Sequence, residues 1–195
     1  MSLITRIAEP MRNYRANKIL NAVKLFIKPG DSILSVGDGD GYVSRRIQEV
    51  TNAKVQGLDI LYFKKYRVQG IPLVIYDGKE IPFADNSFDI SAGVFVLHHC
   101  QDFEFTLQEM IRVSKKKIII FEDVFNNRLE HNFLRFFDTI ENRTFSTEIP
   151  IPYNFQTLTE WKKTFKKFDL TLIYTIQFRA LPLPVRNQAF YLIIK

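Results

Sequence analysis

The chain alternates short apolar runs with longer segments in which apolar residues recur three or four positions apart. Apolar runs of four to eight residues are typical of buried strands, and the wider spacing is typical of amphipathic helices. The pattern predicts strands over residues 32–36, 54–59, 72–76, 88–94, 117–121, 170–177 and 189–194. It predicts helices over residues 4–26, 42–50, 105–111 and 157–168.

Strands and helices alternate along most of the predicted order, which indicates a mostly parallel sheet with helices on both faces. No helix separates the last two strands, so they should pair antiparallel as a hairpin. We therefore expect an α/β fold with a doubly wound, seven-stranded sheet. At 195 residues the chain is expected to form a single domain, residues 1–195.

The strand ending at Val36 runs into a loop with glycine at positions 37, 39 and 41. The next predicted strand ends in Asp59, and a further acidic residue, Asp77, follows the third strand. Glycines let a ligand approach the backbone, and a carboxylate after the second strand can bind a ribose in nucleotide-binding α/β folds. The sequence therefore predicts a site for a nucleoside-bearing cofactor.

The loop excludes several common cofactor motifs. A dinucleotide fingerprint needs its third glycine at position 42, where the chain has Tyr42. The Gly-Lys-Ser/Thr ending of a phosphate-binding P-loop is missing, and so is the glutamate that closes a calcium loop. Because Cys100 is the only cysteine, there is also no cysteine-based metal site, and we expect no bound metal.

Composition is ordinary for a globular protein, with 46% apolar and 25% charged residues. No run reaches the roughly 18 apolar residues of a membrane helix. Glu9 and Pro10 stand where a signal peptide would be apolar, so we expect a cytoplasmic protein without membrane insertion. The net charge of +6 makes a nucleic acid a second candidate partner, but the basic residues are scattered in short runs, which does not favour it.

Further motifs follow the glycine loop in a recognisable order. Residues 76–89 read Tyr-Asp-Gly-Lys-Glu-Ile-Pro-Phe-Ala-Asp-Asn-Ser-Phe-Asp, residues 96–99 read Val-Leu-His-His, and Asp102, Glu109 and Arg112-Val113 come next. Together these motifs resemble the class I S-adenosylmethionine-dependent methyltransferases of the type 11 branch, across nearly the whole chain. The resemblance implies a Rossmann-like fold, S-adenosyl-L-methionine as cofactor and S-adenosyl-L-homocysteine as product.

The resemblance also implies roles for individual residues. Gly37, Gly39 and Gly41 would line the methionine part of the cofactor, and the backbone of Val94 would touch it. Asp59 would hold the ribose, with Ile60 against the adenine ring. Asp77 would accept a hydrogen bond from the adenine amino group, with the Gly78 backbone nearby.

One position departs from the family pattern. An acidic residue usually stands two places before the first glycine, where it helps to hold the ammonium group of the cofactor, and here that place is Ser35. We hypothesise that a loop aspartate, Asp38 first and Asp40 second, supplies the missing charge. The alternative is that both aspartates point to solvent and simply shape a turn.

Candidate catalytic residues follow the fourth and fifth strands, beside the expected position of the cofactor methyl group. His99 could act as a general base at neutral pH, and the pair Glu122-Asp123 could orient a polar or cationic acceptor. The structural alternatives are that the histidines cap a helix or line the cofactor pocket, and that the acidic pair caps the next helix.

Residues 124–154 are expected to form a lid or insert that selects the acceptor. Five apolar residues recur there at helical spacing: Leu129, Phe133, Phe136, Phe137 and Ile140. They indicate either a lid over an apolar acceptor or a helix packed on the sheet. The favoured function is O- or N-methylation of a small molecule. The alternatives are an RNA or tRNA methyltransferase and a non-catalytic cofactor-binding pseudoenzyme, while the acceptor and the oligomeric state stay open.

Overall fold

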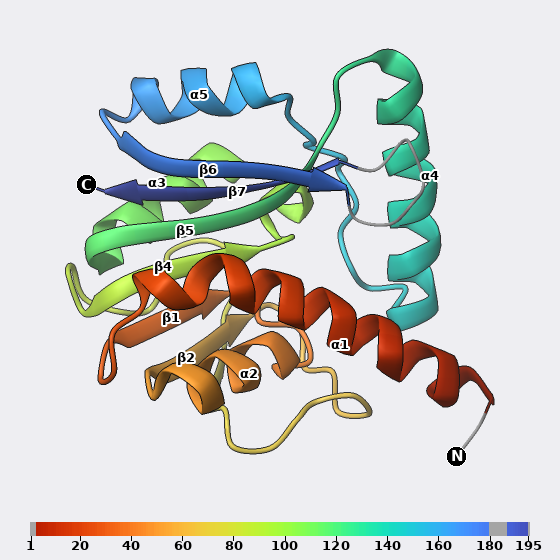
Figure 1. The fold of residues 1–195 in the computed structure, drawn as a ribbon, viewed down its shortest axis with the longest axis horizontal. Coiled ribbons are helices and arrows are strands. Elements are labelled where there is room, and N and C mark those ends of the chain that lie inside the picture. The colour runs from red at the N-terminus through yellow and green to blue at the C-terminus, as the bar shows by residue number, and fades with distance from the viewer. Residues whose placement is uncertain (1–2, 180–186, 195) are drawn as a thin grey trace.

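The computed structural model describes residues 3–179 and 187–194, and it contains a seven-stranded sheet in the order β3-β2-β1-β4-β5-β7-β6 (Figure 1). The strands are β1 (Ser32–Val36), β2 (Lys54–Asp59), β3 (Leu73–Ile75), β4 (Phe88–Val94), β5 (Ser114–Val124), β6 (Thr171–Arg179) and β7 (Asn187–Ile194). The helices are α1 (Leu3–Val23), α2 (Tyr42–Thr51), α3 (Phe103–Val113), α4 (Arg128–Phe145) and α5 (Leu158–Lys167), with short 3-10 turns η1 (Lys24–Phe26) and η2 (Leu97–His99).

Strands β1 to β5 pair parallel, and β7 pairs antiparallel with both β5 and β6. This arrangement confirms the predicted fold class, including the C-terminal hairpin. The hairpin inserts β7 next to β5, so that β6 becomes the edge strand.

Two apolar layers cover the sheet. Buried side chains of α1 and α2, such as Ile19 and Ile47, pack on one face with Ile33 and Phe121. On the other face, buried side chains of α3 and α5, such as Met110 and Trp161, form the second layer. Figure 1 shows α1 and α2 together in front of the sheet. The helices therefore lie on both faces, and a crevice can open only at the ends of the strands.

Some boundaries differ from the prediction for physical reasons. The first helix gives way to a 3-10 turn after Val23, before the Pro29-Gly30 turn. Strand β5 extends to Val124 because Asp123 and Val124 pair with Gln188 and Asn187 of β7. Of the apolar residues expected on the inner face of the first helix, those at positions 4, 7, 8 and 11 have side chains outside the described part of the structure.

Helix α4 stands across the carboxyl ends of the parallel strands (Figure 1). Leu134 and Asp138 are its buried residues. Four of the apolar residues noted in the sequence are instead exposed, by between 38% and 63%: Leu129, Phe133, Phe136 and Ile140. The apolar stripe of α4 therefore does not pack on the sheet, and the role of residues 124–154 as a lid stays a prediction.

The motif residues Glu109 and Arg112 of α3 hold the segment before β4. Glu109 accepts a hydrogen bond from the Ile81 amide at 2.8 Å. Arg112 donates to the carbonyls of Ile81 and Phe83 and pairs with Asp85. These contacts fix the chain that leads from β3 to β4. Over the described residues, no helix has the length and apolarity needed to cross a bilayer.

Candidate active site

The site predicted from the sequence lies where the strand order reverses. From β1 the sheet continues through β2 and β3 on one side and through β4 and β5 on the other. The helices that follow β1 and β4, α2 and α3, pack on opposite faces. In open α/β sheets ligands bind in the crevice at the carboxyl ends of the strands at such a point.

The three loop glycines all have left-handed backbone conformations, with φ of 65°, 57° and 75° at Gly37, Gly39 and Gly41. A Cβ atom on Gly37 would lie 2.1 Å from Cγ2 of Val96, so the loop approaches the segment after β4 closely. A Cβ atom on Gly39 would meet no atom within 4 Å. The loop is therefore packed at its first glycine and open at its second.

Asp59 fixes the open part of this loop. One carboxylate oxygen accepts a hydrogen bond from the Gly39 amide at 2.7 Å, and the other accepts from the Leu61 amide at 3.0 Å. The residue is 7% exposed, and its burial raises the pKa of the carboxyl group. The structure thus brings Asp59 to the glycine loop, as the sequence predicted.

Asp38 is not placed to supply the charge missing at Ser35. Its carboxylate accepts hydrogen bonds from Ser44 Oγ and, at 2.5 Å, from Arg67 Nη1. Both side chains of the ion pair are buried, and Arg67 also donates to the Gly39 carbonyl. A Cβ atom on Gly57 would lie 2.5 Å from Asp38 Oδ2, so glycine at 57 makes room for this carboxylate. Asp38 therefore ties the loop to the segment after β2.

Asp40 is also engaged. It accepts a hydrogen bond from the Tyr42 amide at 2.9 Å and lies 2.8 Å from Nη2 of Arg12. Burial, the largest influence, raises the pKa of its carboxyl group above the usual value. The guanidinium of Arg12 also covers the Tyr42 ring at 4.0 Å. Both loop aspartates therefore anchor the turn through ion pairs with arginines, so neither points to solvent as the alternative expected.

Helix α1 borders the site with two arginines. The Nε atom of Arg12 is buried and has no hydrogen-bond partner among the described residues. Arg15 lies over the Phe95 ring at 4.1 Å. Phe95, directly after β4, has a φ of 54°, an unfavourable conformation for a bulky residue and one often found at functional sites. Arg12 was not noted in the sequence, because only its contact with the loop gives it significance.

The expected adenine-binding residues lie on the β2 and β3 side of the loop. Ile60 is 37% exposed, and a Cβ atom on Gly78 would lie 3.3 Å from its Cγ2 atom. Asp77 is exposed and accepts a hydrogen bond from the Lys79 amide at 3.0 Å. Val94, at the end of β4, is partly buried and lines a cavity of about 60 Å³ with Ser35 and Gly37.

Glu122 and Asp123 do not form a pair. Successive residues of β5 point to opposite faces, so the extension of this strand separates the two side chains. Glu122 accepts hydrogen bonds from the amides of Val96 and Leu97 and contacts His98. Asp123 is 3% exposed and accepts from Gln188 of β7 at 2.9 Å. We therefore assign neither residue to acceptor binding.

His98, His99 and Asp138 form a compact cluster between η2 and α4. The Nε2 atoms of His98 and His99 lie 3.4 Å and 3.6 Å from Oδ1 of Asp138. Burial alone would lower the pKa of His98, but the charges of Glu122 and Asp138 raise it to about 10. Burial and the positive charge of His98 lower the pKa of His99 to about 4. In the absence of other ligands, His98 is the charged ring and His99 the neutral one.

Sequence reasoning missed two partners in these networks, Arg67 and Asp138. Arg67 lies in the connection between β2 and β3, where no periodicity marks it. The sequence indicates the position of Asp138 only weakly. This residue follows the buried Leu134 by one helical turn and therefore lies on the inner face of α4. A carboxylate on the inner face of a helix implies a partner on the facing element.

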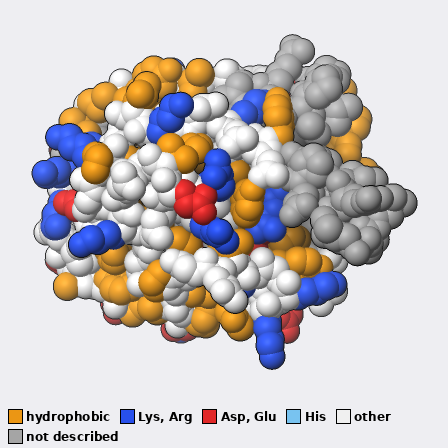
Figure 2. All heavy atoms as spheres, turned by 60° about the horizontal axis from the view of Figure 1, so that its bottom comes forward, with side chains coloured by type: hydrophobic (Ala, Val, Ile, Leu, Met, Phe, Trp, Pro, Cys, Tyr) orange, Lys and Arg blue, Asp and Glu red, His pale blue; other side chains and the backbone are white. Residues whose placement is uncertain are grey.

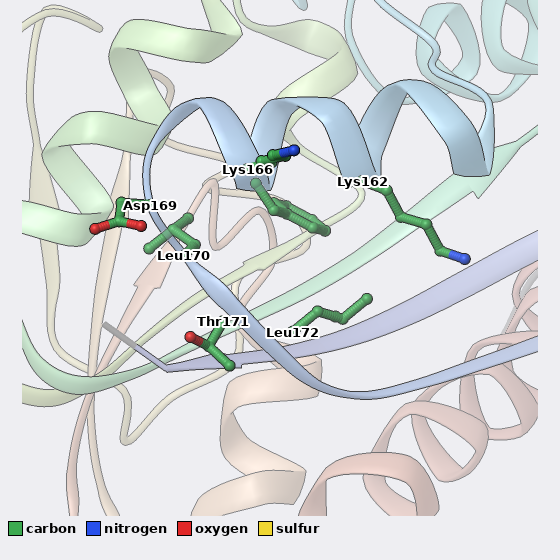
Figure 3. A pocket seen from close by; sticks show the side chains of 7 residues that line it. Lys162, Lys166, Asp169, Leu170, Thr171 and Leu172 are labelled. Carbon is green, nitrogen blue, oxygen red and sulfur yellow. The ribbon is translucent and has the colours of Figure 1, made fainter.

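A larger cavity, of about 210 Å³, lies elsewhere. It is formed between the end of α5 and the start of β6, and its lining includes Lys162, Lys166 and Asp169 (Figure 3). Because β6 runs parallel to β5, its start lies at the opposite edge of the sheet from the glycine loop. This cavity takes no part in the site.

Known proteins resemble the chain in both sequence and fold. The family model described as "Methyltransferase domain" matches residues 34–121. A demethylmenaquinone methyltransferase of Corynebacterium kroppenstedtii is 34% identical over 90 residues, which cover 45% of this chain and 39% of that protein. The chain therefore spans about two fifths of that curated relative.

Two solved structures share the fold. A SAM-dependent methyltransferase from Aquifex aeolicus has a TM-score of 0.64 and 17% identity, over 91% of this chain and 89% of that one. A phosphoethanolamine N-methyltransferase of Haemonchus contortus, solved with S-adenosylhomocysteine, has a TM-score of 0.67 and 16% identity, over 92% of this chain and 52% of that one. The family match over residues 34–121 and the fold shared with these two structures agree with the resemblance to class I S-adenosylmethionine-dependent methyltransferases that the glycine loop indicates.

Proposed function

We propose that the chain binds S-adenosyl-L-methionine at the carboxyl ends of β1, β2 and β4 and transfers its methyl group to a small-molecule acceptor. The observation that carries this proposal is the geometry of Asp59 and Gly39. A buried carboxylate lies against the one loop glycine whose Cβ position is open, where a ligand can contact the backbone directly.

The residues present fit the cofactor at both ends. The open space over Gly39, together with the buried and unpartnered Nε atom of Arg12, suits the methionine part and its carboxylate. With Asp38 and Asp40 engaged, we assign the ammonium group to backbone carbonyls, including that of Val94. Asp59 would accept from the ribose, while Ile60, Asp77 and Gly78 would border the adenine ring.

The cofactor supplies an electrophilic methyl group, so the protein mainly has to orient the acceptor and exclude water. Where the acceptor must lose a proton, His99 is the candidate base, and its pKa of about 4 keeps the ring neutral near pH 7 but makes it a weak base. Its Nδ1 atom lies 2.9 Å from the Pro150 carbonyl, so Nε2 is the nitrogen with a free lone pair. We therefore keep His99 as the candidate base and withdraw Glu122 and Asp123.

A small, apolar acceptor is favoured over RNA. Helix α4 presents exposed apolar side chains at the same edge of the sheet as the site. On the face shown in Figure 2, lysine and arginine side chains are dispersed among apolar and uncharged atoms, with acidic atoms between them. An RNA enzyme would instead need a continuous basic surface. The name of the demethylmenaquinone methyltransferase relative fits an apolar acceptor.

Calorimetry with S-adenosylmethionine tests the binding step. Asp59→Asn keeps an oxygen for the Gly39 amide but removes the charge, so we expect affinity to fall about tenfold or more, since hydrogen bonds to charged groups contribute roughly 1.5–3 kcal/mol. The matched control is Asp169→Asn, an exposed aspartate at the far edge of the sheet. No binding by the unmodified protein would refute the proposal, and equal loss in both variants would refute the role of Asp59.

A transfer assay tests the acceptor class. The protein is incubated with methyl-labelled cofactor and separate metabolite, lipid and RNA pools, and label is expected in a small-molecule or lipid fraction. Label in RNA, with a rate that falls steeply as salt rises, would favour the RNA alternative. Binding of the cofactor without transfer to any pool would favour a pseudoenzyme.

A further inference from the structure

We propose that His98, His99 and Asp138 bind a divalent first-row transition metal ion. The sequence carries no spaced ligand motif for such a site, because two ligands are adjacent in η2 and the third comes from α4. The fold brings them together: three ligand atoms, one from each residue, lie within 4.8 Å of one another. The site does not require bound cofactor, but an ion on Nε2 of His99 would occupy the lone pair that the proposed function assigns to the base.

The hydrogen bonds of the two rings leave the correct nitrogen atoms for a metal. Nδ1 of His98 lies 2.5 Å from Glu122 Oε2, and Nδ1 of His99 lies 2.9 Å from the Pro150 carbonyl. These oxygens can only accept, so each Nδ1 carries the proton. The Nε2 lone pair of neutral His99 is then free, and an ion would displace the proton on Nε2 of His98. Metal-binding histidines typically donate their other N–H to a carboxylate or a carbonyl in this way.

Two of the three distances suit a small ion. Bonds of about 2.0–2.1 Å in a tetrahedral site put neighbouring ligand atoms roughly 3.3 Å apart. The two distances from Nε2 to Asp138 Oδ1 are 3.4 Å and 3.6 Å, and all three ligand atoms lie within 4.8 Å of one another.

The charges of the cluster provide an independent argument. Glu122 and Asp138 are 1% and 5% exposed, and Oδ2 of Asp138 is buried without a hydrogen-bond partner among the described residues. A buried carboxylate oxygen without a partner is costly. A divalent ion bound by Oδ1 next to two neutral histidines would balance both carboxylates, and binding through both oxygens of Asp138 would also satisfy Oδ2. Without an ion, only the proton of His98 opposes the two negative charges.

The donor set indicates the class of ion. Two imidazoles and one carboxylate suit zinc, iron(II) and cobalt(II), whereas magnesium and calcium prefer oxygen ligands alone. The side chain of His99 is 16% exposed, against 3% for His98 and 6% for Asp138. An ion therefore enters past His99.

The test uses the full chain, stripped of metal with a chelator, and titrates it with zinc or cobalt ions. Calorimetry should give one ion per chain, and cobalt should give the visible absorption of a low-symmetry site containing nitrogen ligands. We expect Asp138→Asn and His99→Gln each to lower the affinity at least tenfold. The matched control, His131→Gln, replaces the third histidine of the chain, which lies on α4, and should leave binding unchanged.

Three outcomes would overturn the proposal. The first is the absence of saturable binding by the unmodified protein, and the second is binding that survives both ligand substitutions. The third is binding that is lost in His131→Gln, since it would place the ion on the surface of α4. Circular dichroism checks that each variant folds. If Asp138→Asn does not fold, metal binding by His99→Gln alone tests the proposal, because His99 is the more exposed residue.

Discussion

At the scale of single residues, two properties of a glycine can be separated: its backbone conformation and the free space around its Cβ position. Gly39 and Gly30 both have positive φ, of 57° and 85°, and at both a Cβ atom would meet nothing within 4 Å. Only Gly39 lies at the proposed cofactor site. Gly30 is in the turn before β1. It therefore has the same backbone constraint but lies away from the proposed ligand.

This pair allows a controlled prediction about the cofactor. Alanine at either position should cost roughly 1–2 kcal/mol of stability, because a left-handed backbone is unfavourable for residues with a Cβ atom. Gly39→Ala should also weaken binding of S-adenosylmethionine strongly, since its methyl group would occupy the open space. Urea unfolding and calorimetry on both variants measure the two effects. Equal cofactor affinity in Gly39→Ala and Gly30→Ala would contradict the placement of the ligand over Gly39.

Some residues of the site could be predicted from the sequence and others could not. The placement of the glycines and Asp59 at one loop could, because it follows from local geometry at the ends of consecutive strands. The roles of Asp38 and Asp138 could not, because they depend on Arg67 in a distant loop and on histidines from another element. A charge in a loop motif reveals its function only when its partner is known.

At the scale of elements, the amino ends of β1 and β4 are joined by one side chain. Asp89 accepts hydrogen bonds from the amide and the hydroxyl of Ser32, at 2.9 Å and 2.7 Å, while its own amide donates to the Ser32 hydroxyl. The bonds from Ser32 lower the pKa of the Asp89 carboxyl group from 3.8 to about 2. The contact lies at the opposite end of these strands from the glycine loop.

The lowered pKa predicts a specific dependence of stability on pH. Because the folded pKa is below the unfolded value, the stabilisation is fully present above about pH 4 and is lost as the pH falls through about 2. Asp89→Asn should lower the free energy of unfolding by roughly 1–3 kcal/mol near pH 7. Between pH 5 and about 2, the stability of this variant should then fall less than that of the unmodified protein. Urea midpoints across this range measure the difference. An acid profile parallel to that of the unmodified protein would rule out this role, and Asp169→Asn serves as control.

The elements themselves were mostly predictable, and the clearest exception is the carboxyl end of β5. The bounds of β1, β2 and β4 agree with the sequence prediction, and two of these strands have a clear local stop, β1 before Gly37 and β2 at Asp59. Strand β5 is longer than predicted, since Glu122 and Asp123 looked like a polar stop. Pairing with β7 carries the strand through both residues, and such a pairing partner is not visible in local sequence.

At the scale of the whole molecule, the orientation of α4 decides what the carboxyl edge of the sheet presents to an acceptor. Helical periodicity showed that Leu129, Phe133, Phe136 and Ile140 share a face. It could not show which way that face points, because both orientations give the same pattern. The structure turns Leu134 and Asp138 inward and leaves the apolar stripe exposed. An exposed apolar stripe at the site edge is typical of a binding surface.

This orientation predicts that substitution of Leu134 lowers mainly stability, whereas substitution of Phe136 lowers mainly activity. Leu134→Ala should lower the free energy of unfolding by roughly 2–5 kcal/mol, because Leu134 is 2% exposed. Phe136→Gln should change the unfolding free energy by less than about 0.5 kcal/mol, because Phe136 is 59% exposed. If the stripe holds the acceptor, Phe136→Gln should nevertheless raise the KM for acceptor and leave cofactor affinity unchanged.

The control Ile173→Gln replaces an exposed apolar residue of β6, 51% accessible, and should leave both constants unchanged. A large loss of stability in Phe136→Gln would show that the stripe is packed against the protein, and an unchanged KM would place the acceptor elsewhere.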